Sequence, residues 1–166
     1  MITLIVGGAR SGKSLVAERF VATLPPPTTY VATAAVDPGD VDFAARVEAH
    51  RSRRPTSWAT IDAGRDLAGP LAQIEGTVLV DALGTWVAAS DGFAVDLDAL
   101  VDVLSRRQGD TVVVTEEVGL GVHPSTEVGG RFRDALGLVN QAVAEVADRV
   151  LLVVAGRILP FERSPW

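Results

Sequence analysis

The chain has 166 residues, of which 48% are hydrophobic and 22% charged, close to the average for globular proteins and unlike a disordered or fibrous chain. Its net charge of -6 argues against nucleic acid as a partner, and the absence of cysteine excludes disulfides, thiolate metal sites and a cysteine nucleophile. No apolar run approaches the ~20 residues that span a bilayer. We therefore expect one cytoplasmic domain over residues 1–166 with no membrane span.

Short β-branched runs alternate with longer helical stretches along the chain. Strands are predicted at residues 2–6, 29–33, 58–61, 77–81, 111–115 and 150–154. Helices are predicted at residues 12–23, 40–53, 65–73, 83–90, 97–106 and 126–147. Because the strands are continuously apolar, we expect a mostly parallel sheet covered by helices on both faces. The predicted fold class is a three-layer α/β fold, with residues 158–160 as an antiparallel C-terminal edge strand.

A phosphate-binding loop follows the first predicted strand and makes the expected fold P-loop NTPase-like. The motif is Gly7-Gly8-Ala9-Arg10-Ser11-Gly12-Lys13-Ser14. We expect Gly7 and Gly12 to adopt positive φ angles, so that successive N–H groups reach phosphate oxygens at a helix N-terminus. Lys13, the only lysine in the chain, would bind the β- and γ-phosphates, and Ser14 would bind Mg²⁺. The alternative is a glycine-rich turn that binds no nucleotide.

Acidic residues follow two of the buried strands. Asp81 ends one apolar run, at the position where a phosphoryl-transfer enzyme holds Mg²⁺ through water. The alternative for Asp81 is the N-cap of the helix that begins near Leu83. Glu116 and Glu117 come before a glycine-containing loop, and either can reach a metal or an acceptor hydroxyl if they lie at the carboxyl end of the sheet. Solvated loop acids are the alternative for this pair.

The chain has two histidines, His50 and His123, and His50 lies on the second predicted helix. Arg46, His50 and Arg53 or Arg54 recur at helical spacing, which places them on one face. A neutral imidazole there can attack the α-phosphate of a nucleoside triphosphate, and guanidinium groups would hold the phosphates and disfavour the protonated imidazole. From the residues alone, a solvated basic face with an inert histidine stays open.

Four stretches of the sequence together resemble one enzyme family. They are the phosphate loop with Ala17-Glu18 after it; Tyr30-Val31-Ala32-Thr33; Ala45-Arg46-Val47 through His50-Arg51 to Arg54-Pro55 and Trp58; and Glu117-Val118-Gly119-Leu120-Gly121 through Pro124 to Arg131-Phe132-Arg133-Asp134, Gly137 and Val139-Asn140-Gln141. The chain resembles the bifunctional adenosylcobinamide kinase/adenosylcobinamide-phosphate guanylyltransferases of cobalamin biosynthesis. The stretches run from near the N-terminus to the last long helix, so the resemblance covers most of the chain.

The resemblance implies two reactions. ATP or GTP phosphorylates the aminopropanol hydroxyl of adenosylcobinamide, and GMP is then transferred from GTP to that phosphate with release of pyrophosphate. The guanylylated histidine falls on His50, since the adjacent histidine of some relatives is Ala49 here. Lys13 and Glu117 are the other expected catalytic residues, with Mg²⁺ at Ser14 and Asp81. The residues expected to bind nucleotide are those of the phosphate loop together with Asp81, Arg46, Arg51, Arg53 and Arg54.

The resemblance also implies a homotrimer, and two other functions stay open beside it. A single-function P-loop kinase for another small hydroxylated metabolite would leave His50 incidental. A nucleotide-switch binding module would hydrolyse nucleotide without an acceptor. Such a module lacks support here, because the Asn-Lys-x-Asp type of guanine-binding motif cannot occur in a chain whose only lysine is Lys13.

Overall fold

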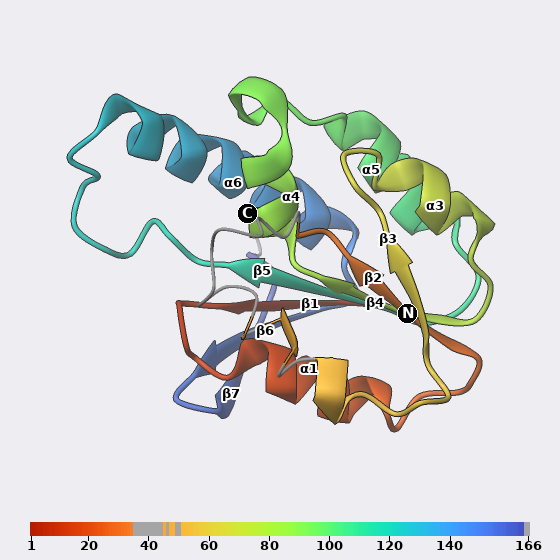
Figure 1. The fold of residues 1–166 in the computed structure, drawn as a ribbon. Coiled ribbons are helices and arrows are strands. Elements are labelled where there is room, and N and C mark those ends of the chain that lie inside the picture. Colours follow the sequence, from red (N-terminus) through yellow and green to blue (C-terminus); the bar gives the residue numbers. More distant parts are fainter. Residues whose placement is uncertain (35–44, 46, 49–50, 165–166) are drawn as a thin grey trace.

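The computed structural model describes residues 1–34, 45, 47–48 and 51–164. The strands are β1 (Ile2–Gly7), β2 (Thr28–Ala32), β3 (Ala59–Asp62), β4 (Thr77–Asp81), β5 (Thr111–Glu116), β6 (Arg149–Val154) and β7 (Arg157–Phe161). They form one seven-stranded sheet in the order β3-β2-β4-β5-β1-β6-β7 (Figure 1). Every neighbouring pair is parallel except β6 and β7. The predicted parallel sheet with an antiparallel edge strand is confirmed.

Helices lie on both faces of the sheet. They are α1 (Lys13–Val21), α3 (Ala68–Gln73), α4 (Leu83–Ala89), α5 (Leu97–Arg106) and α6 (Glu127–Val146), with a 3₁₀ turn at Asp91–Phe93. In Figure 1, α1 lies on one side of the sheet, and α3, α4, α5 and α6 lie on the other. The predicted helix at 40–53 falls largely outside the described residues, although residues 51–53 are helical. No helix within the described ranges is both long and apolar enough to cross a membrane.

The core explains why the strands are continuously apolar. On β1, Leu4 packs into the cluster beneath α3 to α6, whereas Ile5 packs into the cluster beneath α1. Both side chains are at most 1% exposed. Successive side chains of a strand point to opposite faces, so a sheet with two covered faces needs apolar residues at consecutive positions. The three-layer α/β class predicted from the sequence is therefore confirmed.

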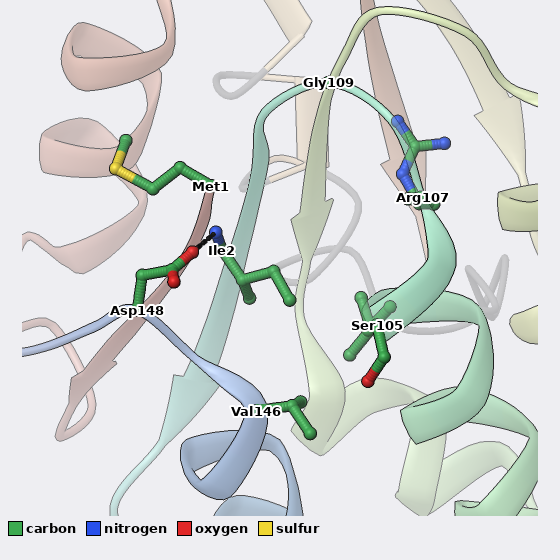
Figure 2. Close-up of a pocket in the computed structure, with 8 residues that line it drawn as sticks. Met1, Ile2, Ser105, Arg107, Gly109, Val146 and Asp148 are labelled. Carbon is green, nitrogen blue, oxygen red and sulfur yellow. Dashed lines mark hydrogen bonds between the residues drawn. The ribbon is translucent and has the colours of Figure 1, made fainter.

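The amino end of the sheet carries a small groove of about 340 Å³ (Figure 2). Its lining residues are Met1, Ile2, Leu104, Ser105, Arg107, Gly109, Val146 and Asp148. Asp148 accepts a hydrogen bond from the N–H of Ile2 at 2.6 Å, which ties the end of α6 to the start of β1. The phosphate loop begins where β1 ends, so this groove and the loop lie at opposite ends of the strands.

Candidate active site

The phosphate loop connects β1 to α1. Its backbone conformation differs from the predicted one at one of the two glycines. Gly12 has a φ of 90°, as expected. Gly7 is the last residue of β1 and has no positive φ, so that prediction is wrong, and Arg10 adopts the left-handed conformation instead, with a φ of 56°. Gly7 is required for space, because a Cβ there would lie 2.5 Å from Ser11 Oγ and 2.7 Å from the Val153 carbonyl oxygen.

The loop also leaves backbone donors without partners. Within the described part of the chain, the N–H groups of Ala9, Arg10 and Gly12 donate no hydrogen bond. These groups lie directly before the N-terminus of α1, where the first N–H groups of a helix lack intrahelical acceptors. The loop therefore has the unfilled donors and the helix end that an anion-binding site requires.

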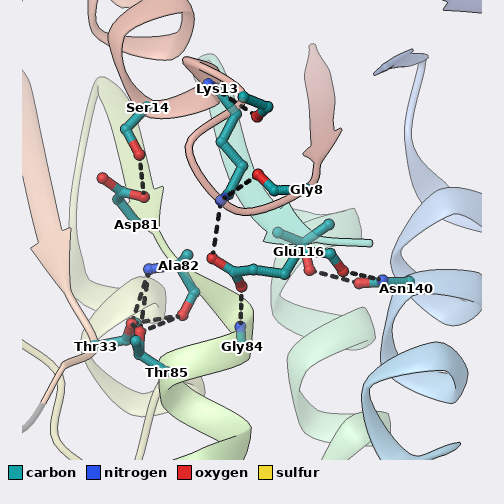
Figure 3. A network of polar contacts seen from close by, with 12 residues as sticks. Gly8, Lys13, Ser14, Thr33, Asp81, Ala82, Gly84, Thr85, Glu116 and Asn140 are labelled. Carbon is teal, nitrogen blue, oxygen red and sulfur yellow. Dashed lines mark hydrogen bonds and ion pairs between the residues drawn. The ribbon is translucent and has the colours of Figure 1, made fainter. Parts of the chain in front are cut away.

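Lys13 lies at the centre of a polar network (Figure 3). Its side chain is 11% exposed, and Nζ lies 3.2 Å from Glu116 Oε1. Nζ also approaches the Gly8 carbonyl oxygen at 3.5 Å. The other carboxylate oxygen of Glu116 accepts a hydrogen bond from the N–H of Gly84, in the first turn of α4, at 3.0 Å. Asn140 of α6 donates to the Glu116 carbonyl oxygen at 3.0 Å, so the end of β5 is fixed from both sides.

Asp81 faces the phosphate-loop helix from the end of β4. Its Oδ1 accepts a hydrogen bond from Ser14 Oγ at 3.2 Å, and its Oδ2 accepts one from the Tyr30 phenol at 3.1 Å. Burial, reinforced by the Asp81 charge, raises the pKa of Tyr30, so the phenol remains a donor at every working pH. The N-cap alternative for Asp81 is wrong, because the N-cap residue of α4 is Ala82.

The Glu117 side chain has a different partner from that of Glu116, which pairs with Lys13. Its Oε1 accepts a hydrogen bond from the N–H of Gly119, within its own loop. Its backbone N–H donates to the Gly7 carbonyl oxygen at 3.2 Å, which joins this loop to the end of β1. Of the two adjacent glutamates, the structure thus brings Glu116 to Lys13 and turns Glu117 into its own loop.

Arg53 and Arg54, which follow His50 in the sequence, have separate partners. Arg53 makes a two-pronged ion pair with Glu18 of α1, through Nε at 3.1 Å and a terminal nitrogen at 3.2 Å. The Arg54 guanidinium lies over the Tyr30 ring, 3.6 Å from its centroid. The Arg51 residue is exposed. Two of the predicted site residues, Arg46 and His50, lie outside the described residues.

Some polar residues at the site had no role assigned from the sequence. Thr33 Oγ1 hydrogen bonds with both the N–H and the carbonyl oxygen of Ala82, at 2.9 and 2.6 Å, and with the Thr85 hydroxyl at 2.6 Å. It therefore fixes the chain directly after Asp81. Thr33 and Asn140 both fall in the stretches that carry the family resemblance, and that was the only sequence signal for them.

The site combines a strand, a glycine loop, a lysine and a hydroxyl on the following helix turn, and an acid on β4. This combination defines a P-loop nucleotide-binding protein. A solved ATPase of a bacterial type III secretion system is similar to 91% of this chain, with a TM-score of 0.59 and 12% sequence identity. This chain spans 50% of that protein's length. The likeness shows the P-loop fold.

The chain belongs to the cobinamide kinase/cobinamide phosphate guanyltransferase family, whose model matches residues 3–161. It is 38% identical to the bifunctional adenosylcobalamin biosynthesis protein CobP of Pseudomonas aeruginosa, over 99% of both chains. It is 35% identical to the corresponding CobU protein of Salmonella typhimurium, over 94% of this chain and 97% of that one. The resemblance drawn from the sequence is confirmed, and it favours a bifunctional enzyme over a single-function kinase or a nucleotide switch.

Proposed function

We propose that this protein is a bifunctional enzyme of cobalamin biosynthesis. It phosphorylates the aminopropanol hydroxyl of adenosylcobinamide with ATP or GTP, and then transfers GMP from GTP to that phosphate with release of pyrophosphate. The observation that carries the proposal is the arrangement of Lys13, Ser14 and Asp81 around one phosphate loop in a chain that matches this family almost from end to end. Both steps use a nucleoside triphosphate, so one phosphate loop can serve both.

In the kinase step, the loop N–H groups and the start of α1 hold the triphosphate. Lys13 leaves the Glu116 carboxylate and binds phosphate oxygens, which carry more negative charge than a single carboxylate. That exchange frees Glu116 Oε1, while Oε2 stays on the Gly84 N–H. Glu116 is then the carboxylate beside the phosphate loop that can accept the proton of the acceptor hydroxyl. The geometry favours Glu116 over Glu117 for this role.

The donor set at the loop fits Mg²⁺. Ser14 Oγ and Asp81 Oδ1 are hard oxygen donors that lie 3.2 Å apart. Mg²⁺ in such sites keeps several waters and is bound by one or two protein oxygens together with substrate phosphates. When bound, Mg²⁺ would neutralise charge on the transferred phosphates. Ser14 and Asp81 are the residues that would hold it.

In the transferase step, we assign the nucleophile to His50 from its place in the sequence. The imidazole nitrogen attacks the α-phosphorus of GTP, and the bond from that phosphorus to the bridging oxygen of pyrophosphate breaks. A phosphate oxygen of adenosylcobinamide phosphate then attacks the same phosphorus. The nitrogen–phosphorus bond breaks, which releases adenosylcobinamide-GDP and returns the histidine. Arg46 and Arg51 remain candidates for contacts with the nucleotide.

Two variants test this assignment. The wild-type protein is incubated with adenosylcobinamide, ATP and GTP, products are identified by mass, and covalent label is measured with GTP labelled at the α-phosphate. His50→Ala should still form adenosylcobinamide phosphate, but it should lose both the acid-labile, base-stable label and adenosylcobinamide-GDP. His123→Ala is the matched control and should retain both reactions. If the wild-type protein retains no covalent label and the His50→Ala variant is fully active, the protein is a single-function kinase.

The assembly and location of the protein stay predictions. We propose a homotrimer, as the family resemblance implies, and a single cytoplasmic domain over residues 1–166, as the length and composition predict. Sedimentation equilibrium of the full chain measures the oligomeric state directly, and a mass other than three chains would contradict the first of these predictions.

A further inference from the structure

Tyr30 contacts two parts of the site that have separate roles in the proposed chemistry: the acid Asp81 and the arginine segment after His50. Its phenol donates to Asp81, the acid that faces Ser14. Its ring carries the Arg54 guanidinium at 3.6 Å, the geometry of a cation–π contact. Tyr30 is 5% exposed and belongs to β2, between β3 and β4, so neither the ring nor the phenol can shift freely. One rigid side chain thus contacts both the metal-binding acid and the segment after His50.

A second contact holds the same segment to the phosphate-loop helix. Glu18 lies on α1 one turn beyond Ser14 and is 7% exposed. Its two carboxylate oxygens each accept from Arg53, in the fork geometry that fixes orientation as well as distance. Arg54 also donates to Thr60 Oγ1 of β3 at 3.5 Å. The segment 51–54 is therefore joined to α1, β2 and β3 by side-chain contacts.

We propose that Tyr30 is a positioning residue that couples Asp81 to residues 51–54, which follow His50 directly in the sequence, while the Glu18–Arg53 pair fixes these residues to the phosphate-loop helix. The inference rests on the proposed function, because His50 precedes Arg53 by three residues in the sequence. Arg53 and Arg54 act here through Glu18 and Tyr30 rather than through the nucleotide. Because Tyr30 is rigid, it holds the Asp81 carboxylate and the Arg54 guanidinium in fixed positions relative to each other.

The first test removes only the phenol hydroxyl. Tyr30→Phe keeps the ring under Arg54 but takes one hydrogen bond from Asp81. Removal of a group that orients a metal ligand should raise the Mg²⁺ concentration for half-maximal nucleotide binding by about tenfold. The measurement is a Mg²⁺ titration of GTP affinity by calorimetry, which needs no turnover, with thermal unfolding as the check that the variant is folded. An unchanged Mg²⁺ dependence would overturn the role of the phenol.

The second test asks whether Arg54 acts through Tyr30. Arg54→Gln alone should raise the same Mg²⁺ requirement, and in the Tyr30→Phe background it should add less than about a twofold change, because the link is already cut. Fully additive effects would mean that Arg54 reaches the nucleotide by itself, which contradicts the coupling. Arg106→Gln is the control, since it removes an exposed ion pair with Asp102 on α5 and should leave the titration unchanged.

The third test separates the Glu18–Arg53 pair from a purely structural role. Glu18→Gln keeps the side-chain shape but loses the charged acceptor of Arg53. The initial rate of histidine labelling from α-labelled GTP should fall about tenfold, with less than about a twofold change in GTP affinity at saturating Mg²⁺. Equal losses in labelling and affinity would overturn this part of the inference. Absence of label in the wild-type protein would instead overturn the proposed function, and the Mg²⁺ titrations would still decide the coupling.

Discussion

Two cations at opposite ends of the sheet have contrasting surroundings. At the amino end, Arg107 donates to the carbonyl oxygens of Leu71, Ile74 and Gly76 and to Thr111 Oγ1 (Figure 2 shows its position). At the carboxyl end, Lys13 has one carboxylate at 3.2 Å and one carbonyl oxygen at 3.5 Å (Figure 3). Burial lowers the pKa of Arg107, yet an arginine begins so high that it stays charged at neutral pH.

The contrast separates a structural cation from a functional one. Arg107 satisfies the carbonyl groups where α3 ends and where the chain turns into β4, and these acceptors would otherwise be left unpaired. Lys13 is held mainly by Glu116, a side chain that can release it when a more highly charged phosphate arrives. A cation that must change partners during a reaction needs few, exchangeable contacts, whereas one that closes a fold needs many fixed contacts.

The largest expected effect is at the exchangeable cation. Lys13→Met should lower kinase kcat/KM by roughly 10²- to 10³-fold, because a positioned charge on the transferred phosphates is lost. Steady-state kinetics measure this loss, and thermal unfolding should show a protein that still folds. Lys13→Arg is the matched control and should not restore activity, since a planar guanidinium does not replace a compact ammonium. Near-normal turnover by Lys13→Met would remove Lys13 from the chemistry.

The fixed cation should show the opposite behaviour. Arg107→Met should lower the free energy of unfolding by about 3 kcal/mol, because several carbonyl oxygens lose their donor. Urea denaturation measures the change, and nucleotide affinity of the folded variant should stay at the wild-type value. The neighbouring variant Arg106→Gln should change stability by about 0.5 kcal/mol or less. A weaker nucleotide affinity without loss of stability would contradict the comparison.

The smallest expected effect concerns which glutamate holds Lys13. Glu116→Gln should strengthen ADP binding by about threefold, because Lys13 no longer leaves an ion pair to reach phosphate. The kinase rate should fall in the same variant if Glu116 accepts the proton of the acceptor hydroxyl. Glu117→Gln is the matched control and should leave ADP affinity unchanged. Calorimetric titration with ADP compares the two, and a larger effect of Glu117→Gln would return the role to that residue.

Local sequence patterns determined the order of elements and the phosphate loop. The predicted strands and the antiparallel edge were found because continuous β-branched runs are stable only when both sheet faces are covered. Gly12 and Lys13 were identified for the same kind of reason, since the loop, its left-handed glycine and the following helix are contiguous in sequence. Asp81 is predicted to hold Mg²⁺ because a phosphoryl-transfer site needs an acid at the end of a neighbouring strand, and the structure places it 3.2 Å from Ser14 Oγ.

Only the tertiary structure decided which side chains meet. β5 ends at Glu116, whose side chain reaches Lys13, whereas Glu117 begins the following loop and its side chain accepts from the Gly119 N–H. The partners of Arg53 and Arg54, Glu18 and Tyr30, come from elements more than twenty residues away along the chain. Gly7 is glycine because of Val153, on β6. Sequence patterns predict where strands, helices and buried positions lie, whereas strand order and register bring distant side chains into contact.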